Sequence, residues 1–210
     1  MFLTRVYLDK LCRDFQKDMG DVYRLHQRVM SAFDEKLPAE ERVLFRVEEP
    51  KDSPPFMLVQ AHTAPDWGKW SQDYILPTHL CPPTVLENPA IKEFEPTLRE
   101  GPYVFRLRAN PVADNSGKRR GLIREDKQRE WLEHKGELHG FTPLRYYVYD
   151  EGFKRGYRGR RQMTFVSVVY EGVLRVDNLD MMREAVCNGV GRSRAFGFGL
   201  LSLRPMGGQL

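Results

Sequence analysis

A glycine-rich segment, residues 189–203, combines residue types that can bind an anion. Glycine lets the backbone take positive φ and approach a ligand closely, and successive free N–H groups in such a turn form a concave anion site. The candidate phosphate-binding residues of this segment are Gly189, Gly191, Arg192, Ser193, Arg194, Gly197 and Gly199. The pattern favours a phosphate ligand, although a tight helix-to-strand turn with incidental charges would look the same.

Two common phosphate-binding motifs do not fit this segment. A P-loop requires Lys followed by Ser or Thr after its last glycine, and here Leu200 and Leu201 occupy those places. A dinucleotide-binding fingerprint requires a strand before the glycines and a helix after them. The short apolar run 200–203 instead predicts a buried strand after the glycines. We therefore set both nucleotide-binding classes aside.

A tyrosine and a histidine form a second candidate site, on a predicted helix. Asp21 is a typical N-cap, and apolar residues at helical spacing predict a helix from Asp21 to Phe33. His26 falls at the margin of the apolar face, and Tyr23, three residues earlier, is its neighbour on the same side. Histidine, with a reference pKa of about 6.5, can give or take a proton near neutral pH, and tyrosine is a good donor. A half-buried packing histidine is the alternative.

Two clusters of basic residues predict contact with a polyanion. Residues 153–161, which we call the basic arm, hold five cations and two aromatic rings in nine residues, and residues 115–120 form a second basic turn. Cations spaced by glycine suit a flexible hairpin that follows a phosphate backbone, although a solvated hairpin tip is the alternative. The cations concerned are Lys118, Arg119, Arg120, Lys154, Arg155, Arg158, Arg160 and Arg161.

Composition bounds the class of protein. Apolar residues make up 41% of the 210 residues, enough to bury a core. No apolar run approaches the ~18 residues of a membrane helix, so we expect no membrane partner. The three cysteines lack metal-type spacing, and we expect a cytoplasmic protein with reduced thiols and no bound metal or cofactor.

Charge is unevenly distributed along the chain. The net charge is +4, but residues 1–100 carry 13 Lys and Arg against 17 Asp and Glu, whereas residues 101–210 carry 20 against 12. A basic half beside an acidic half indicates that one half contacts a polyanion.

The order of predicted elements indicates an α+β fold. Both halves approach the order β-α-β-β-α-β, with antiparallel sheets and helices on one face, which is the ferredoxin-like order also found in RNA-recognition motifs. The first half is irregular over residues 63–90. In the second half we expect separate strands at 144–149 and 163–170 around the basic arm, and a return of the chain at Gly172. Two tandem domains follow, at residues 1–98 and 99–210.

Three stretches carry a resemblance to a known family. The glycine-rich segment, the string Phe-Arg-Leu-Arg-Ala-Asn-Pro at residues 105–111, and Glu-Gly-Val-Leu at 171–174 are similar to those of repeat-associated RNA-processing proteins of CRISPR systems. The sequence resembles above all the CasE family, the crRNA-processing endoribonuclease subunit of type I-E Cascade. The similarity runs from Met1 to about Pro205 and implies the same two-domain arrangement.

The resemblance assigns roles to the candidate residues. It implies that His26 is the catalytic histidine. Tyr23, a hydrogen-bond donor beside it, is a second catalytic candidate that can orient the phosphate or share the proton transfer. The resemblance also implies that the basic arm docks on the stem of the CRISPR repeat hairpin. Family members can carry a lysine about one turn beyond the histidine, and Ser31 stands in that region here. The cation that stabilises the phosphorane therefore stays open.

The implied activity is metal-independent cleavage of precursor CRISPR RNA at the base of the repeat stem-loop. The 2′-hydroxyl would attack, which leaves a 5′-hydroxyl and a 2′,3′-cyclic phosphate or 3′-phosphate, and the protein would stay on the mature crRNA with other Cascade subunits. A non-catalytic subunit of the same fold that binds the RNA stem-loop is the main alternative. A third option is a single-strand binder that stacks bases on Tyr146, Tyr147 and Tyr149.

Overall fold

The computed structural model describes residues 1–115 and 118–206, and the chain divides into two compact units. The first unit comprises Met1–Glu95, Arg155–Met163 and Ala195–Gly197. The second comprises Pro96–Lys154, Thr164–Arg194 and the segment that starts at Phe198. The tip of the basic arm and three residues of the glycine-rich segment thus pack with the first unit. The predicted domain boundary between residues 98 and 99 stays a prediction.

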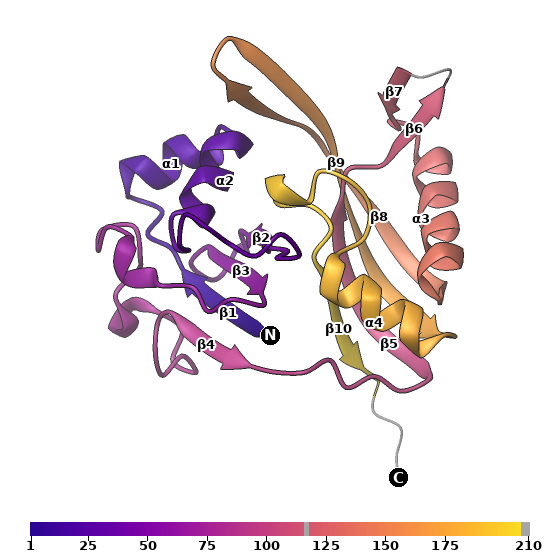
Figure 1. The fold of residues 1–210 in the computed structure, drawn as a ribbon, viewed down its shortest axis with the longest axis horizontal. Coiled ribbons are helices and arrows are strands. Elements are labelled where there is room, and N and C mark those ends of the chain that lie inside the picture. Colours follow the sequence, from indigo (N-terminus) through magenta and orange to yellow (C-terminus); the bar gives the residue numbers. More distant parts are fainter. Residues whose placement is uncertain (116–117, 207–210) are drawn as a thin grey trace. The chain divides into compact units, whose positions relative to one another are not determined.

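The first unit is an antiparallel sheet with helices α1 and α2 (Figure 1). Its elements are β1 (Phe2–Tyr7), α1 (Arg13–Met19), α2 (Val22–Met30), β2 (Leu44–Glu48), β3 (Phe56–Ala61) and β4 (Ala90–Glu93). The four strands lie in the order β2-β3-β1-β4, and all the pairs are antiparallel. This is the ferredoxin-like arrangement predicted from the element order.

Aromatic packing replaces a second crossover helix in the first unit. Between β3 and β4 the chain forms only two short 3₁₀ turns, Trp67–Lys69 and Thr78–Leu80, as the irregular pattern of this segment predicted. The rings of Trp67 and Trp70 meet edge to face at 4.7 Å, and Trp70 meets Tyr74 in the same way at 4.9 Å. All three side chains are buried in the core of the unit.

Helix α2 begins as the sequence predicts but ends earlier. Asp21 is its N-cap, and its side chain accepts hydrogen bonds from the backbone N–H groups of Tyr23 and Arg24. The helix ends at Met30, three residues before the predicted Phe33, because residues 31–33 continue as a turn. The preceding helix α1 was not predicted; its short length and its two buried residues, Phe15 and Asp18, leave little apolar periodicity to detect.

The second unit has the complete β-α-β-β-α-β order, with a small hairpin inserted after its first strand. Its elements are β5 (Gly101–Ala109), β6 (Val112–Asn115), β7 (Lys118–Gly121), α3 (Glu125–His139), β8 (Phe141–Arg158), β9 (Arg161–Val176), α4 (Leu179–Asn188) and β10 (Leu201–Pro205). The main sheet has the strand order β10-β5-β9-β8, and β6 pairs with β7.

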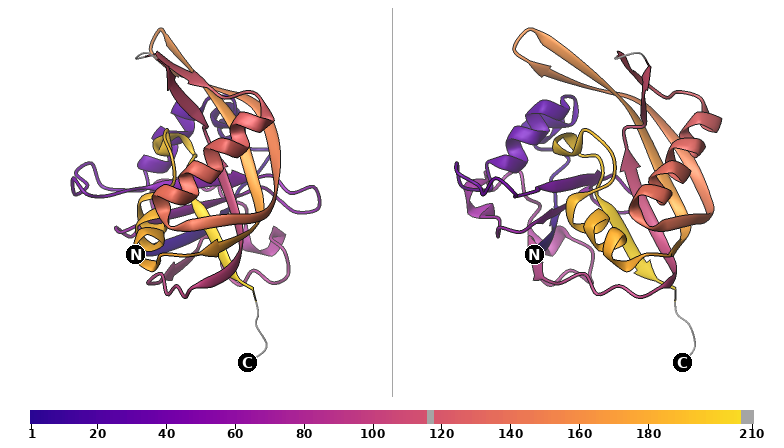
Figure 2. Two further views of the ribbon diagram at one scale, coloured as in Figure 1. Left: turned by 90° about the vertical axis from the view of Figure 1, so that its right-hand side faces the viewer. Right: turned by 45° about the vertical axis from the view of Figure 1, so that its right-hand side comes forward.

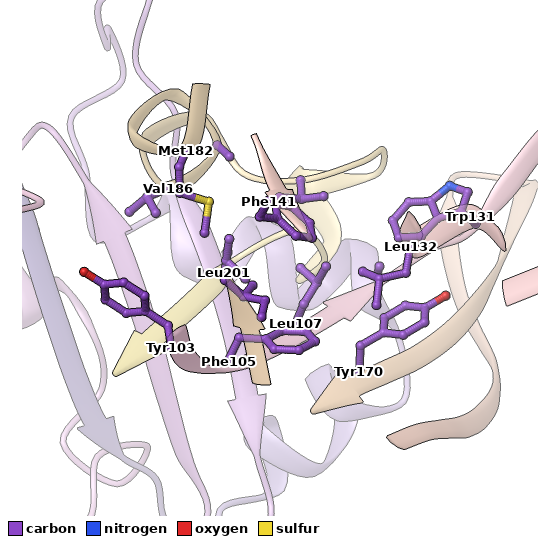
Figure 3. Close-up of a cluster of buried hydrophobic side chains, with 14 of the residues drawn as sticks. Tyr103, Phe105, Leu107, Trp131, Leu132, Phe141, Tyr170, Met182, Val186 and Leu201 are labelled. Atoms are coloured by element: carbon purple, nitrogen blue, oxygen red, sulfur yellow. The ribbon is translucent and has the colours of Figure 1, made fainter. Parts of the chain in front are cut away.

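Helices α3 and α4 cover one face of the main sheet of the second unit (Figure 2). Phe105 and Leu107 on β5 alternate with polar neighbours and point into the core, where Leu132 of α3 and Met182 of α4 meet them (Figure 3). The stacked rings of Trp131 and Tyr170 lie 5.9 Å apart in the same cluster. The α+β prediction with helices on one face is confirmed.

The strands around the basic arm are longer than predicted. β8 runs without interruption from Phe141 to Arg158, and β9 from Arg161 to Val176, so the prediction of a return at Gly172 is wrong. Gly172 pairs with Phe105 inside the sheet, and a Cβ there would lie 2.2 Å from the carbonyl oxygen of Arg145. The glycine therefore allows a close approach of two backbones rather than a chain reversal.

Within the part of the chain that the structure describes, no helix is long and apolar enough to cross a membrane.

Candidate functional site

Helix α2 places the tyrosine–histidine pair at the margin of its buried face. Val22, Leu25 and Val29 are buried in the first unit, whereas Tyr23 and His26 are half-buried. The ring centroids of Tyr23 and His26 lie 6.1 Å apart. The spacing of three residues on a helix therefore brings the two side chains together, as expected.

The opposite side of α2 is held by a buried carboxylate. Arg24 and Arg28 donate through Nε to the two oxygens of Asp18, at 3.2 and 2.9 Å, and Tyr74 donates its hydroxyl to the same group at 3.2 Å. Asp18 is only 2% exposed, so these donors satisfy a charge that would otherwise be costly to bury. The two arginines thus point away from the His26 side and anchor the helix.

Residues 195–197 of the glycine-rich segment complete the surroundings of His26. The ring of Phe196 lies edge-on to His26 at 5.7 Å between centroids and 6.4 Å from the ring of Tyr23. Gly197 has φ of +85°, and a Cβ at this position would lie 3.1 Å from the ring of Phe45. Phe196 was not among the residues predicted to form the site. Its position between the predicted glycines was the only signal for it in the sequence.

The environment of His26 favours the neutral imidazole. Burial lowers the pKa of His26 below its ordinary value of 6.5, and a hydrogen bond with the backbone of Ala195 opposes this shift only in part. A histidine that is neutral at neutral pH can accept a proton, and the backbone contact fixes the orientation of its ring.

The tip of the basic arm contacts the first turn of α2. The backbone N–H of Tyr157 donates to Oδ1 of Asp21 at 3.1 Å. Gly156 is buried, and a Cβ there would lie 2.9 Å from Cγ2 of Val22 and 3.1 Å from the backbone nitrogen of Tyr23. The arm and the Tyr23–His26 pair are therefore neighbours in space, although some 130 residues separate them in the sequence.

The arginines of the arm remain available to solvent. Arg155, Arg158, Arg160 and Arg161 are exposed, whereas Lys154 is half-buried at the base of the arm, in the second unit. The chain turns between β8 and β9 at Gly159, with φ of +60°. The arrangement presents four positive charges on a narrow two-stranded hairpin.

The remaining glycines of the predicted anion site lie where the backbone takes positive φ. Gly189, Gly191 and Gly199 all have positive φ, as does Ser193 at +62°. The N–H of Gly189 donates to Ala185 O, and the N–H of Gly199 donates to Arg108 O. These two groups are therefore used inside the protein, so an anion would meet the side chains of this segment rather than these N–H groups.

Three of the predicted basic residues of the second unit, Arg119, Arg192 and Arg194, line a cavity of about 710 Å³. None of its lining residues is acidic, and Asn110, 5% exposed, donates from Nδ2 to Ser193 Oγ at 2.9 Å. The residues are Asn110, Val112, Arg119, Gly121, Phe153, Thr164, Phe165, Val166, Gly191, Arg192, Ser193 and Arg194. The size, the three arginines and the exposed Phe153 suit one nucleotide of a polyanion.

Arg192 and Arg194, which line this cavity, also affect two titratable groups outside its lining. Burial lowers the pKa of Lys135, and the nearby charge of Arg192 lowers it further. The pKa of His139 is lowered by burial and then by the charges of Lys135 and Arg194, against an opposing effect of Glu184. Arg194 itself donates from Nη1 to the carbonyl oxygen of Asn188, near the end of α4, at 2.6 Å.

The other predicted contacts lie on the small hairpin and on the edge strand. Arg119 and Arg120 on β7 are exposed, and Arg119 lies 3.9 Å from Asp114; the side chain of Lys118 lies outside the described residues. On β8, Tyr147 and Tyr149 are exposed and their rings lie 6.2 Å apart, whereas Tyr146 packs against the core.

Within residues 1–115 and 118–206, no three His, Cys, Asp or Glu side chains gather closely enough to hold a metal ion.

These features define a two-unit ferredoxin-like protein with a histidine site beside a cationic hairpin. The family model described as CRISPR associated protein matches residues 1–205, and the chain belongs to this family.

The relatives match this chain over their full length. The CRISPR-associated endoribonuclease Cse3 of Thermus thermophilus is 31% identical over 222 residues, which cover 98% of this chain and 100% of the relative. The CRISPR system Cascade subunit CasE of Escherichia coli strain K12 is 28% identical over 227 residues, with 98% and 100% covered. A solved structure of Cse3 bound to a 19 nt RNA superposes with a TM-score of 0.84 at 30% identity, and covers 98% of this chain and 100% of that one.

Proposed function

We propose that this protein is the endoribonuclease that processes precursor CRISPR RNA and then stays on its product as a Cascade subunit. The cut falls at the base of the repeat stem-loop. The observation that carries the proposal is the contact of Tyr23 and His26 with the ring of Phe196, and of His26 with the backbone of Ala195, next to the arginine-bearing tip of the arm. Full-length similarity to an endoribonuclease and to a Cascade subunit supports it.

The chemistry needs little from the protein, because RNA carries its own nucleophile. His26 takes the proton of the 2′-hydroxyl next to the scissile phosphate, a role that suits an imidazole kept neutral by burial. The 2′-oxygen attacks phosphorus, the bond to the 5′-oxygen breaks, and the leaving oxygen takes up a proton. The products are a 2′,3′-cyclic phosphate and a 5′-hydroxyl, without a metal ion or cofactor.

Tyr23 assists at the same phosphate. Its hydroxyl is a hydrogen-bond donor at neutral pH and, on the same helix face as His26, can orient a phosphate oxygen or share the proton transfer. Phe196 packs against both rings and limits their rotation. A positioned donor or acceptor of this kind contributes about 10²–10⁴-fold to the rate.

The basic arm and the cavity of the second unit bind the stem-loop. Double-stranded RNA is recognised mostly by its shape and its backbone, so exposed arginines on a narrow hairpin are suitable contacts. The cavity lined by Arg119, Arg192 and Arg194 accepts a further phosphate and its base. The first domain, residues 1–98, thereby carries the active helix, and the second, residues 99–210, carries most of the RNA-binding surface.

We also place the protein in the cytoplasm. Cys12, Cys81 and Cys187 are free thiols, which agrees with a reducing compartment.

Incubating the purified protein with end-labelled repeat RNA in EDTA tests the function. The proposal expects a single cut at the base of the stem, with a 5′-hydroxyl on the downstream fragment and a cyclic phosphate on the other. Tight binding without any cut would make the protein a non-catalytic RNA-binding subunit of the same fold.

A further inference from the structure

We infer that Asp21 is a positioning residue that ties the basic arm to the active helix, so that RNA held by the arm sets the position of Tyr23 and His26. This inference rests on the proposed function, because it concerns how the same site is controlled. It adds a residue and a contact to which the proposed chemistry gives no role.

The first observation is that one carboxylate oxygen serves two elements. Oδ1 of Asp21 accepts from the backbone N–H groups of Tyr23 at 2.9 Å and Arg24 at 3.4 Å, which caps α2. The same oxygen accepts from the backbone N–H of Tyr157 in the arm at 3.1 Å. Helix capping by Asp21 requires hydrogen bonds only from the first N–H groups of α2. The additional hydrogen bond from Tyr157 therefore belongs to the junction with the arm.

The second observation is the close approach of the two backbones. A Cβ on Gly156 would lie 2.9 Å from Cγ2 of Val22, 3.1 Å from the nitrogen of Tyr23 and 3.4 Å from Oδ1 of Asp21. The φ of Gly156 lies outside the left-handed range, so glycine is needed here for space rather than for conformation. Two independent features, one polar and one steric, therefore fix the arm on the first turn of α2.

The junction lies between the arginines that can hold the RNA and the two residues that act on it, so a displacement of the arm would move Tyr23 and His26. Arg155 and Arg158, which flank it on the arm, are exposed and can hold the RNA backbone. Tyr23 lies two residues from Asp21, and His26 follows within one further turn of the helix. A misplacement of about 1 Å between reacting groups can cost ~10²-fold in rate, so a small shift of the arm is sufficient to change cleavage.

Four variants distinguish the proposed role of Asp21 in holding the arm against α2 from its role as the N-cap of α2. Asp21→Ser keeps a good N-cap, but its shorter side chain no longer reaches Tyr157. Asp21→Asn keeps an acceptor oxygen for both elements and serves as the conservative rescue. Gly156→Ala pushes the arm away and leaves the capping side chain of Asp21 unchanged, and Gly20→Ala is its matched control, because a Cβ there would make only ordinary contact, 3.4 Å from Lys17 O.

Each variant is measured for binding of the repeat stem-loop, for single-turnover cleavage at saturating protein, and for thermal unfolding. We expect Asp21→Ser and Gly156→Ala to bind with near wild-type affinity and unfold within a few degrees of wild type, yet cleave about 10- to 100-fold more slowly. Asp21→Asn and Gly20→Ala should cleave at close to the wild-type rate. Because both changes open one junction, the double variant Asp21→Ser with Gly156→Ala should be no slower than the slower single variant.

Three results would overturn the inference: wild-type saturated rates in Asp21→Ser and Gly156→Ala, rate losses that multiply in the double variant, or weaker binding with an unchanged saturated rate. In the last case the contact would only hold the arm. None of these results touches the proposed function, which fails separately if the wild-type protein does not cut the RNA.

Discussion

The two units have the same strand order, but different structures cover the face of the sheet on which the helices pack. Counted along its own four main strands, each sheet runs 4-1-3-2. In the second unit α3 and α4 both cover the sheet, and their apolar residues form one core with it (Figure 3). In the first unit the second crossover holds only 3₁₀ turns, and the rings of Trp67, Trp70 and Tyr74 fill the corresponding core.

The unit without a helix in its second crossover is also the one that carries the Tyr23–His26 pair, on α2. Helix α2 is held from one side by apolar packing and by the bonds of Arg24 and Arg28 to Asp18, which leaves its Tyr23–His26 margin half-open. The loop at 195–197 and the tip of the arm fill that margin. The second unit presents its predicted RNA-binding cations on loops and hairpins, outside α3 and α4.

The largest expected effect is the loss of cleavage when the substrate lacks its 2′-hydroxyl nucleophile, and this change separates cleavage from binding. Replacing the 2′-hydroxyl by hydrogen at the single nucleotide before the cut should abolish detectable cleavage, because the nucleophile is gone. Affinity for the stem-loop, measured by filter binding, should change less than twofold. Product formed from the deoxy substrate would mean that water attacks the phosphate.

The aromatic cluster of Trp67, Trp70 and Tyr74 should stabilise the first unit by about as much as α4 stabilises the second. Trp70→Ala should lower the free energy of unfolding by about 3–5 kcal/mol, and Met182→Ala in α4 by about 2–5 kcal/mol. Both residues are at most 4% exposed. Urea titrations followed by circular dichroism measure both values. A loss under 1 kcal/mol in Trp70→Ala would mean that the cluster does not replace the missing helix.

The arm should contribute to affinity through charge. Each phosphate contact adds about −0.7 to −0.9 to the slope of log K against log salt, so Arg158, Arg160 and Arg161 changed together to Ala should flatten it by about 1–3 units. Arg183→Ala is the control, because Arg183 on α4 is exposed but paired with Asp180. An unchanged slope in the triple variant would place the RNA on another surface.

The smallest effect is on the titration of His26. Burial holds its pKa in the free protein below 6.5, so an NMR titration assigned with His26→Gln should give a midpoint under that value. Stability from the neutral imidazole is complete above pH 6.5 and decreases as pH falls toward the lowered pKa. With His26 as base, cleavage at subsaturating protein should rise through the same midpoint and then level off. A midpoint above 6.5 would contradict the burial argument.

The sequence predicts those features that depend on local patterns. The apolar spacing of α2 and the capping preference of Asp21 define the helix, and the complete element order of the second half defines its fold. The prediction of a return at Gly172 failed because a glycine that admits a second backbone looks the same in a sequence as one that turns the chain.

The assembly of the site depends on tertiary contacts that no local pattern reveals. The contact of Phe196 with His26 joins residues 170 positions apart, and the bond of Tyr157 to Asp21 joins residues 136 positions apart. Tyr23 and His26 could be selected from helix geometry, whereas their neighbours could not. The glycines of residues 189–199 predict an anion site, which stays a prediction; several of them are also required for positive φ and close packing, which no local pattern indicates.

The most direct test of the account is single-turnover cleavage of repeat RNA by His26→Ala, in EDTA and at saturating protein, beside filter binding of the same RNA. The account predicts that the rate falls by about 10²-fold or more while the affinity for the stem-loop stays within about twofold of wild type. Cleavage by His26→Ala at the wild-type rate would contradict the account and place the chemistry elsewhere in the molecule.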